Sequence, residues 1–135
     1  MAYKLHEVEG IGATYAEKLA TAGLSTTDDL LTHGGSRAGR TKISTASGIS
    51  ESLVLKWVNH ADLFRIKGIA GQFAELLEAA GVDTVKEFRN RVPENLHARL
   101  EEVNAAKRLA GRVPSLAELT DMIQQAKQLE PKVSY

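Results

Sequence analysis

Two short glycine-rich segments hold the residues of this sequence best suited to bind a phosphate group. The first reads Val8-Glu9-Gly10-Ile11-Gly12, and the second, 58 residues later, reads Ile66-Lys67-Gly68-Ile69-Ala70-Gly71. Glycine can take a positive φ, which lets successive backbone N–H groups point outward at the start of a following helix. A helix start carries a partial positive charge and N–H groups without acceptors, which suits a phosphate oxygen. Both segments are therefore candidate phosphate-binding turns, with Ile11 as the buried plug of the first.

The residues beside the two turns carry opposite charges. Glu7 and Glu9 flank the first turn, where a carboxylate would repel a phosphate, whereas Arg65 and Lys67 flank the second. We therefore expect the second turn to be the better phosphate site, provided that its late glycine supplies the unusual backbone angle. The alternative is a turn that only joins two helices, since a short glycine motif alone is weak evidence of binding.

A third basic segment lies between Leu30 and Ser50, where the sequence has three basic residues and no acid. These residues could line a phosphate path, although a solvated helix face is the commoner explanation of such a run. Together the candidate nucleic-acid contacts are Gly10, Ile11, Gly12, Arg37, Arg40, Lys42, Arg65, Lys67, Gly68, Ile69, Ala70, Gly71 and Gln72.

Residues for other chemistry are scarce. The sequence has no cysteine, which excludes disulfides, thiolate catalysis and cysteine-held metals. Its histidines are far apart and form no His-x-x-x-His or Glu-x-x-His pair, so that a metal site would require convergence in the fold. They are His6, His33, His60 and His97. No phosphate loop or nucleophile elbow is present either, and we predict a protein that is not an enzyme and has no cofactor and no metal site.

The elements that must position these residues all read as helices, because apolar residues recur at helical spacing and no run alternates over the length of a strand. Capping residues mark most boundaries: Gly23 and Gly81 as stops, Thr26, Ser50 and Ser115 as starts, and a full capping box at Thr84. Trp57 falls on an apolar helix face and is expected in the core, whereas Tyr3 and Tyr135 are freer candidates for a partner surface. The expected helices cover residues 13–22, 26–31, 37–45, 50–61, 71–80, 84–88, 94–110 and 115–129.

The second half of the sequence repeats the plan of the first. Five pairs share the offset of 58 residues: Gly10 with Gly68, Leu19 with Leu77, Gly23 with Gly81, Thr26 with Thr84, and Asp29 with Glu87. One offset across several positions indicates an internal repeat. We predict an all-α fold of two units, residues 1–62 and 63–135, each of about four helices, packed together as one compact domain and joined at residues 62–65.

The composition sets the class of protein. The chain of 135 residues is 43% hydrophobic and 25% charged, which is sufficient for a folded core. Lys plus Arg and Asp plus Glu are 17 each, so that no global positive field attracts nucleic acid or a membrane. No segment has the apolar length of a membrane span or the core of a signal peptide, and the expected location is the cytoplasm.

Two resemblances add to these observations. Val8-Glu9-Gly10-Ile11-Gly12, followed by Tyr15-Ala16-x-x-Leu19, resembles the helix-hairpin-helix motif of DNA ligases, repair glycosylases and polymerases, which implies a grip on the DNA backbone without sequence reading. Nearly the whole chain resembles a bacterial family catalogued as domain of unknown function 4332, which implies tandem helix-hairpin-helix units and no assigned activity. The second resemblance rests on residues 63–69, 76–87 and 93–98, with 47–50, 56–59, 113–116 and 125–127.

Two functional hypotheses follow. The first is a non-enzymatic helix-hairpin-helix module that binds the DNA backbone without sequence preference. The second is a protein–protein interaction adaptor in which the hairpins are structural joints, as the neutral charge and the acid-flanked first turn suggest. A small-molecule enzyme is a distant third. A steep fall of affinity with salt would distinguish the first hypothesis from the second.

Overall fold

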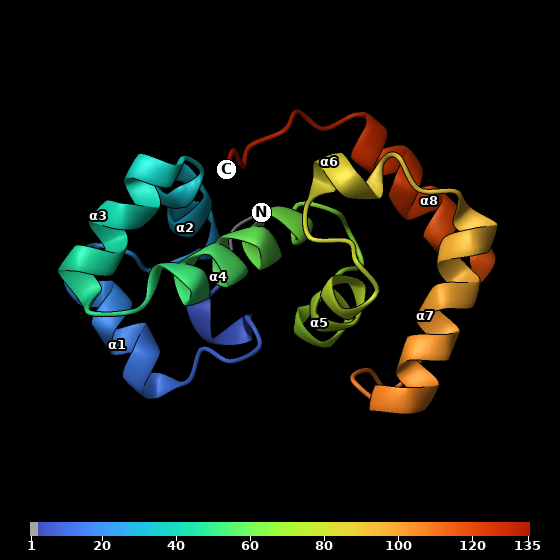
Figure 1. The fold of residues 1–135 in the computed structure, drawn as a ribbon, viewed down its shortest axis with the longest axis horizontal. Helices are drawn as coiled ribbons and strands as arrows, with labels where there is room; N and C mark the ends of the chain where they lie inside the picture. The colour runs from blue at the N-terminus through green and yellow to red at the C-terminus, as the bar shows by residue number, and fades with distance from the viewer. Residues whose placement is uncertain (1–2) are drawn as a thin grey trace.

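A computed structural model describes residues 3–135, which form helices and, apart from one isolated bridge between Lys4 and Thr26, no β-structure. This confirms the predicted all-α class. In Figure 1, α1 to α3 lie on one side, α6 to α8 on the other, and α4 and α5 between them. In chain order the elements are the 3-10 helix η1 (Leu5–Glu7), α1 (Ala13–Thr21), α2 (Thr27–Gly34), α3 (Arg37–Ser47), α4 (Glu51–Leu63), α5 (Gly71–Ala79), α6 (Val85–Phe88), α7 (Pro93–Lys107) and α8 (Leu116–Lys127).

Hydroxyl side chains begin most of these helices, as the sequence predicts. Thr26 and Ser115 form reciprocal capping boxes with Asp29 and Glu118, and Ser50 accepts a hydrogen bond from the backbone of Leu53. The capping box expected at Thr84 is only half formed. The Thr84 hydroxyl accepts from the Glu87 N–H, but the Glu87 carboxylate lies against that hydroxyl and not against the backbone.

Most helix ends differ from the expected ones by one to three residues; α2, for example, continues to Gly34 and α3 to Ser47. α4 continues through Leu63, so that the link to α5 covers residues 64–70. α7 ends at Lys107, three residues early, because Arg108 takes a left-handed conformation with φ 51° and the Asn104 side chain bonds both backbone groups of Ala110. α8 ends at Lys127, short of the expected 129.

The segments that are 58 residues apart share their backbone geometry. Gly10 and Gly68 have φ of 89° and 97°, and Gly23 and Gly81 have φ of 85° and 93°. The helices of the two halves also pack in corresponding pairs. In the first half α1 contacts α3, α2 contacts α4 and α3 contacts α4; in the second half α5 contacts α7, α6 contacts α8 and α7 contacts α8. That the sequence arose as a repeat of two units stays a prediction, but the two halves use one local plan.

A single cluster of buried apolar side chains runs through both halves. α4 contacts α2 and α3 on one side and α5 on the other, so that its buried residues pack against helices of both halves. Trp57 on α4 is buried, as predicted, and meets the Tyr15 ring edge to face. Tyr3 is half buried against Phe64, so that it is not the free surface residue expected from the sequence.

Both ends of the described chain bind to α2. The backbone N–H of Thr27, at the first residue of α2, donates to the Tyr3 carbonyl at 2.9 Å. Residues 128–135 return from α8 toward the first half (Figure 1), where the Ser134 N–H donates to the Gly35 carbonyl at 2.8 Å, directly after α2 ends. No helix among residues 3–135 combines the length and the hydrophobicity that a bilayer crossing requires.

Candidate functional site

The first turn is open to solvent. Gly10 takes the positive φ, Ile11 is buried and donates its N–H to the Val8 carbonyl, and Gly12 is an extended N-cap without a side-chain cap. Gly12, Ala13 and the following Thr14 are exposed. The first backbone N–H groups of α1 therefore lie at the surface, where an anion can approach.

The acidic residues of the first turn have other contacts. The Glu7 carboxylate accepts a hydrogen bond from the Lys4 N–H at 3.1 Å, as part of the cap of η1. The stem of Glu9 lies against the start of α5, since a methyl group added to Gly71 would come within 3.2 Å of the Glu9 Cγ and 2.7 Å of the Glu7 carbonyl oxygen. The first turn thus packs on the second, and both glutamates remain exposed beside it.

The second turn has the same backbone shape, but its second glycine lies one position later, inside the helix that follows. Gly68 takes the positive φ, and Ala70 is an extended N-cap with φ −116°, which any residue can adopt. The replacement of a glycine by Ala70 therefore leaves the turn intact. The condition that Gly71 supply the unusual angle is not met, because Gly71 is the first helical residue of α5; a glycine is required there by the close Glu7 carbonyl.

α8 and the residues after it support the second turn. The Lys67 N–H donates to the Gln125 side chain at 3.0 Å, and Gly68 lies against Met122. Arg65 is engaged internally, at 2.6 Å from the Asp62 carboxylate and 2.7 Å from the Glu130 carbonyl. The Lys67 side chain is exposed and takes part in none of the ion pairs among residues 3–135.

The basic segment on α3 does not form one surface. Arg40 is 4% exposed and donates to the carbonyls of Gly34, Gly35 and Ser134, at 2.9, 3.0 and 2.7 Å. Burial lowers the pKa of Arg40. The prediction that Arg40 contacts phosphate is wrong, because its buried guanidinium links the end of α2 to residue 134 through these three hydrogen bonds. Arg37 and Lys42 are exposed but line different depressions, Arg37 beside Tyr135 and Lys42 beside His33.

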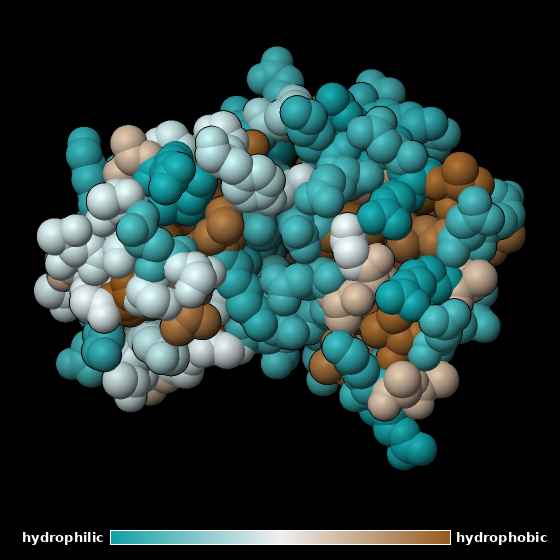
Figure 2. Space-filling model, in the orientation of Figure 1, coloured by the Kyte–Doolittle hydropathy of each residue, from teal (hydrophilic) through white to brown (hydrophobic). Residues whose placement is uncertain are grey.

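A cleft of about 400 Å³ adjoins the second turn. Arg112 on its wall makes two hydrogen bonds to the Glu118 carboxylate, at 2.9 and 2.8 Å, and these hold the pKa of Glu118 at about 2. Figure 2 shows apolar residues reaching the surface between α5 and α7. The cleft is lined on one side by Gly68, Ala70, Gln72 and Phe73, and on the other by Ala110, Gly111, Arg112, Pro114 and Met122.

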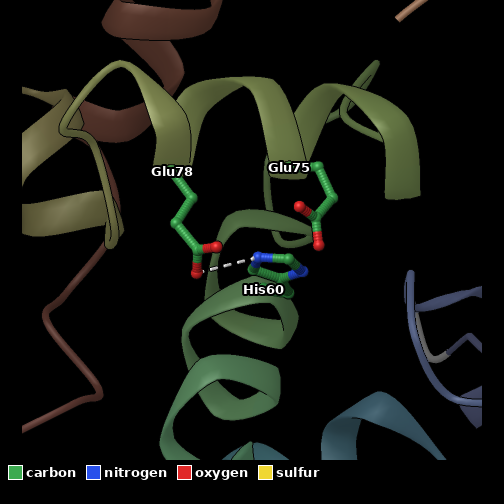
Figure 3. Close-up of side chains that lie close together, drawn as sticks. All are labelled: His60, Glu75 and Glu78. Carbon is green, nitrogen blue, oxygen red and sulfur yellow. Dashed lines mark hydrogen bonds and ion pairs between the residues drawn. The ribbon is translucent and has the colours of Figure 1, made fainter. Parts of the chain in front are cut away.

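The fold also brings together a group that the sequence reasoning missed. His60 on α4 lies beneath Glu75 and Glu78 of α5, with its Nε2 3.2 Å from a Glu78 oxygen (Figure 3). The signal in the sequence was weak: two acids three residues apart on a helix that is otherwise rich in apolar residues, which places both carboxylates on one face.

The comparisons with known proteins give one match. The model of the family described as Domain of unknown function (DUF4332) matches residues 9–129. No curated protein and no solved structure matches the sequence.

Proposed function

The chain belongs to the family described as Domain of unknown function (DUF4332), and from the geometry of its two turns we propose that it is a non-enzymatic module that binds the DNA backbone without reading its sequence. The observation that carries the proposal is the open start of α1. Its N-cap, Gly12, offers no side-chain acceptor, and the exposed N–H groups that follow can donate to phosphate oxygens.

The neighbouring turn supports the same function. α5 also begins with an uncapped, extended residue, Ala70, and the Glu7 to Glu9 backbone packs directly on the start of α5. The start of α5 thus lies beside the turn that leads into α1, and the Lys67 side chain is exposed on the second turn. A net charge of zero means that affinity must come from this local region.

The experiment is a fluorescence anisotropy titration of a labelled random duplex, and of its single strand, at about 50 mM and about 200 mM salt. Ala13→Pro removes one N–H donor at the first position of α1, where proline fits the helix, and is expected to weaken binding about tenfold, the loss of one hydrogen bond to a charged group. Lys67→Glu should weaken binding equally for every sequence.

Lys86→Glu is the matched control, because Lys86 is exposed on α6 and the substitution changes the net charge by the same amount. If Lys86→Glu and Lys67→Glu weaken binding equally, the charge effect is not local and the proposed site is wrong. Absence of salt-sensitive binding by the wild-type protein at the lower salt would contradict the function itself.

The cleft beside the second turn favours the alternative, a protein-interaction adaptor. Its walls include Phe73, Pro114 and Met122, and buried apolar contacts of this kind form the centre of protein interfaces. An adaptor would retain its partner at high salt and would lose it on Gln72→Arg, which places a charge in the cleft. The Ala13→Pro variant would leave such an interaction unchanged.

A further inference from the structure

Four charged or titratable side chains meet where α4 packs on α5. Lys56 and His60 lie one turn apart on α4, and Glu75 and Glu78 face them from α5. The Lys56 ammonium lies 2.9 Å from Glu75 and 3.5 Å from Glu78. The group joins the first half of the chain to the second, and none of its members belongs to the two turns.

His60 is the buried centre of this group. Its side chain is 0% exposed, whereas those of Glu75 and Glu78 are 22% and 27% exposed. Its Nε2 contacts Glu78, but its Nδ1 is buried and has no hydrogen-bond partner among the described residues. Figure 3 shows the imidazole lying across the space between the two carboxylates, with the bonded nitrogen on the side of Glu78 and the other nitrogen on the side of Glu75. A buried nitrogen without a partner is costly unless something else binds it.

The spacing of these atoms fits a metal ion. One ligand atom from each of His60, Glu75 and Glu78 lies within 4.8 Å of the others. Around a tetrahedral Zn²⁺ with bonds of about 2.0 Å, ligand atoms lie roughly 3.3 Å apart. Rotation of the two partly exposed glutamates can shorten the distances between the ligand atoms from up to 4.8 Å to this value, while the helices hold the buried histidine in place.

We propose that His60, Glu75 and Glu78 bind a divalent transition metal ion of the Zn²⁺ class, with the Lys56 ammonium as the competing cation. An imidazole nitrogen with two carboxylate oxygens suits this class, whereas Ca²⁺ requires six to eight oxygen ligands. Lys56 is 33% exposed, and its long side chain can leave the carboxylates for solvent when the ion binds. Water completes the coordination on the exposed side.

The site would strengthen the junction between α4 and α5. An ion that binds the folded chain and not the unfolded chain stabilises the fold by mass action. Zn²⁺ is therefore expected to raise the melting temperature of the full chain, and a chelator to reverse the shift.

The test is calorimetric titration of the full chain with ZnCl₂, with Co²⁺ absorption as a readout of nitrogen and oxygen coordination. We expect one ion per chain. Glu78→Gln and Glu75→Gln should each weaken binding at least about tenfold, the scale on which metal sites respond to changes even outside their ligands. Lys56→Gln should tighten binding, because the competing ammonium is gone.

Glu101→Gln is the matched control, since the exposed His97–Glu101 pair on α7 is the other His–Glu contact among the described residues. Weakening by Glu101→Gln and not by Glu78→Gln would overturn the proposal, as would weaker binding in Lys56→Gln or no binding in the wild-type chain. Circular dichroism of each variant establishes that a loss of binding is not a loss of fold.

Discussion

At the scale of single residues, the two turns differ in the order of one glycine and one alanine, and the atoms around each position explain the difference. The first turn reads Gly-Ile-Gly-Ala and the second Gly-Ile-Ala-Gly. Gly12 and Ala70 hold the same extended N-cap position, and a methyl group on Gly12 would meet no atom within 4 Å. Gly71 has no such freedom, because the Glu7 carbonyl oxygen lies against it.

Gly71→Ala is therefore expected to destabilise the protein by about 1–3 kcal/mol, the usual cost of forcing an extra carbon into packed structure. Gly12→Ala should change the free energy of unfolding by less than about 0.5 kcal/mol, because a smaller unfolded-state entropy offsets a poorer cap. Urea unfolding of both variants measures the difference. Equal effects would mean that the first turn does not pack on α5 as described.

At the scale of elements, the end of α7 is set by one residue in an unfavourable conformation. Arg108 is the one non-glycine residue with positive φ among residues 3–135, and it is exposed. A left-handed conformation costs a side-chain-bearing residue roughly 1–2 kcal/mol. The Asn104 side chain, bonded to both backbone groups of Ala110, holds the loop in spite of this cost.

Arg108→Gly should consequently raise the free energy of unfolding by about 0.5–1 kcal/mol, since glycine takes this conformation without strain. Lys107→Gly, one position earlier and still inside α7, should lower it by about the same amount through lost helix propensity. Thermal or urea unfolding distinguishes the two, and a loss of stability in Arg108→Gly would show that the Arg108 side chain has a role of its own.

At the scale of the whole molecule, the α4–α5 junction is expected to make stability depend on pH. Burial raises the pKa of Glu78, but the hydrogen bond and charge of His60, with the charge of Lys56, outweigh it and hold the pKa below the ordinary 4.5. Burial and the charge of Glu78 raise the pKa of the nearby Asp83. A lowered carboxyl pKa contributes stability above the ordinary value, which is lost as the pH falls through the lower folded value.

Glu78→Gln should therefore reduce stability at neutral pH, on the order of 1 kcal/mol, and reduce the further loss as the pH falls through and below the ordinary 4.5. Urea unfolding across this range, with Glu101→Gln as the control on α7, measures both effects. An unchanged acid dependence in Glu78→Gln would show that the junction does not couple folding to proton binding.

The sequence predicted the features that depend on neighbours along the chain. Starts at Thr26, Ser50 and Ser115 follow from a hydroxyl placed three residues before a backbone N–H, a local relation that the order of residues alone reveals. The role of Arg40 could not be predicted, because one of its acceptors is 94 residues away. The group around His60 was missed for the same reason: Lys56 and His60 lie on α4, Glu75 and Glu78 lie on α5, and the two pairs meet only when these helices pack together.

The return of the chain to α2 has a consequence for the order of folding. Tyr3 bonds the first residue of α2, 24 residues on, whereas Ser134 bonds Gly35, 99 residues back. The first closure involves a short loop and can form early, but the second must bring distant segments together against a larger loss of chain entropy. Until residues near 134 dock, the guanidinium of Arg40 lacks its Ser134 acceptor and the Gly35 carbonyl lacks the Ser134 N–H. The first half is thus made from the early part of the chain, but the end of α2 completes its contacts late in folding. In native-state hydrogen exchange, the amide of Ser134 is expected to exchange before those of the core helices.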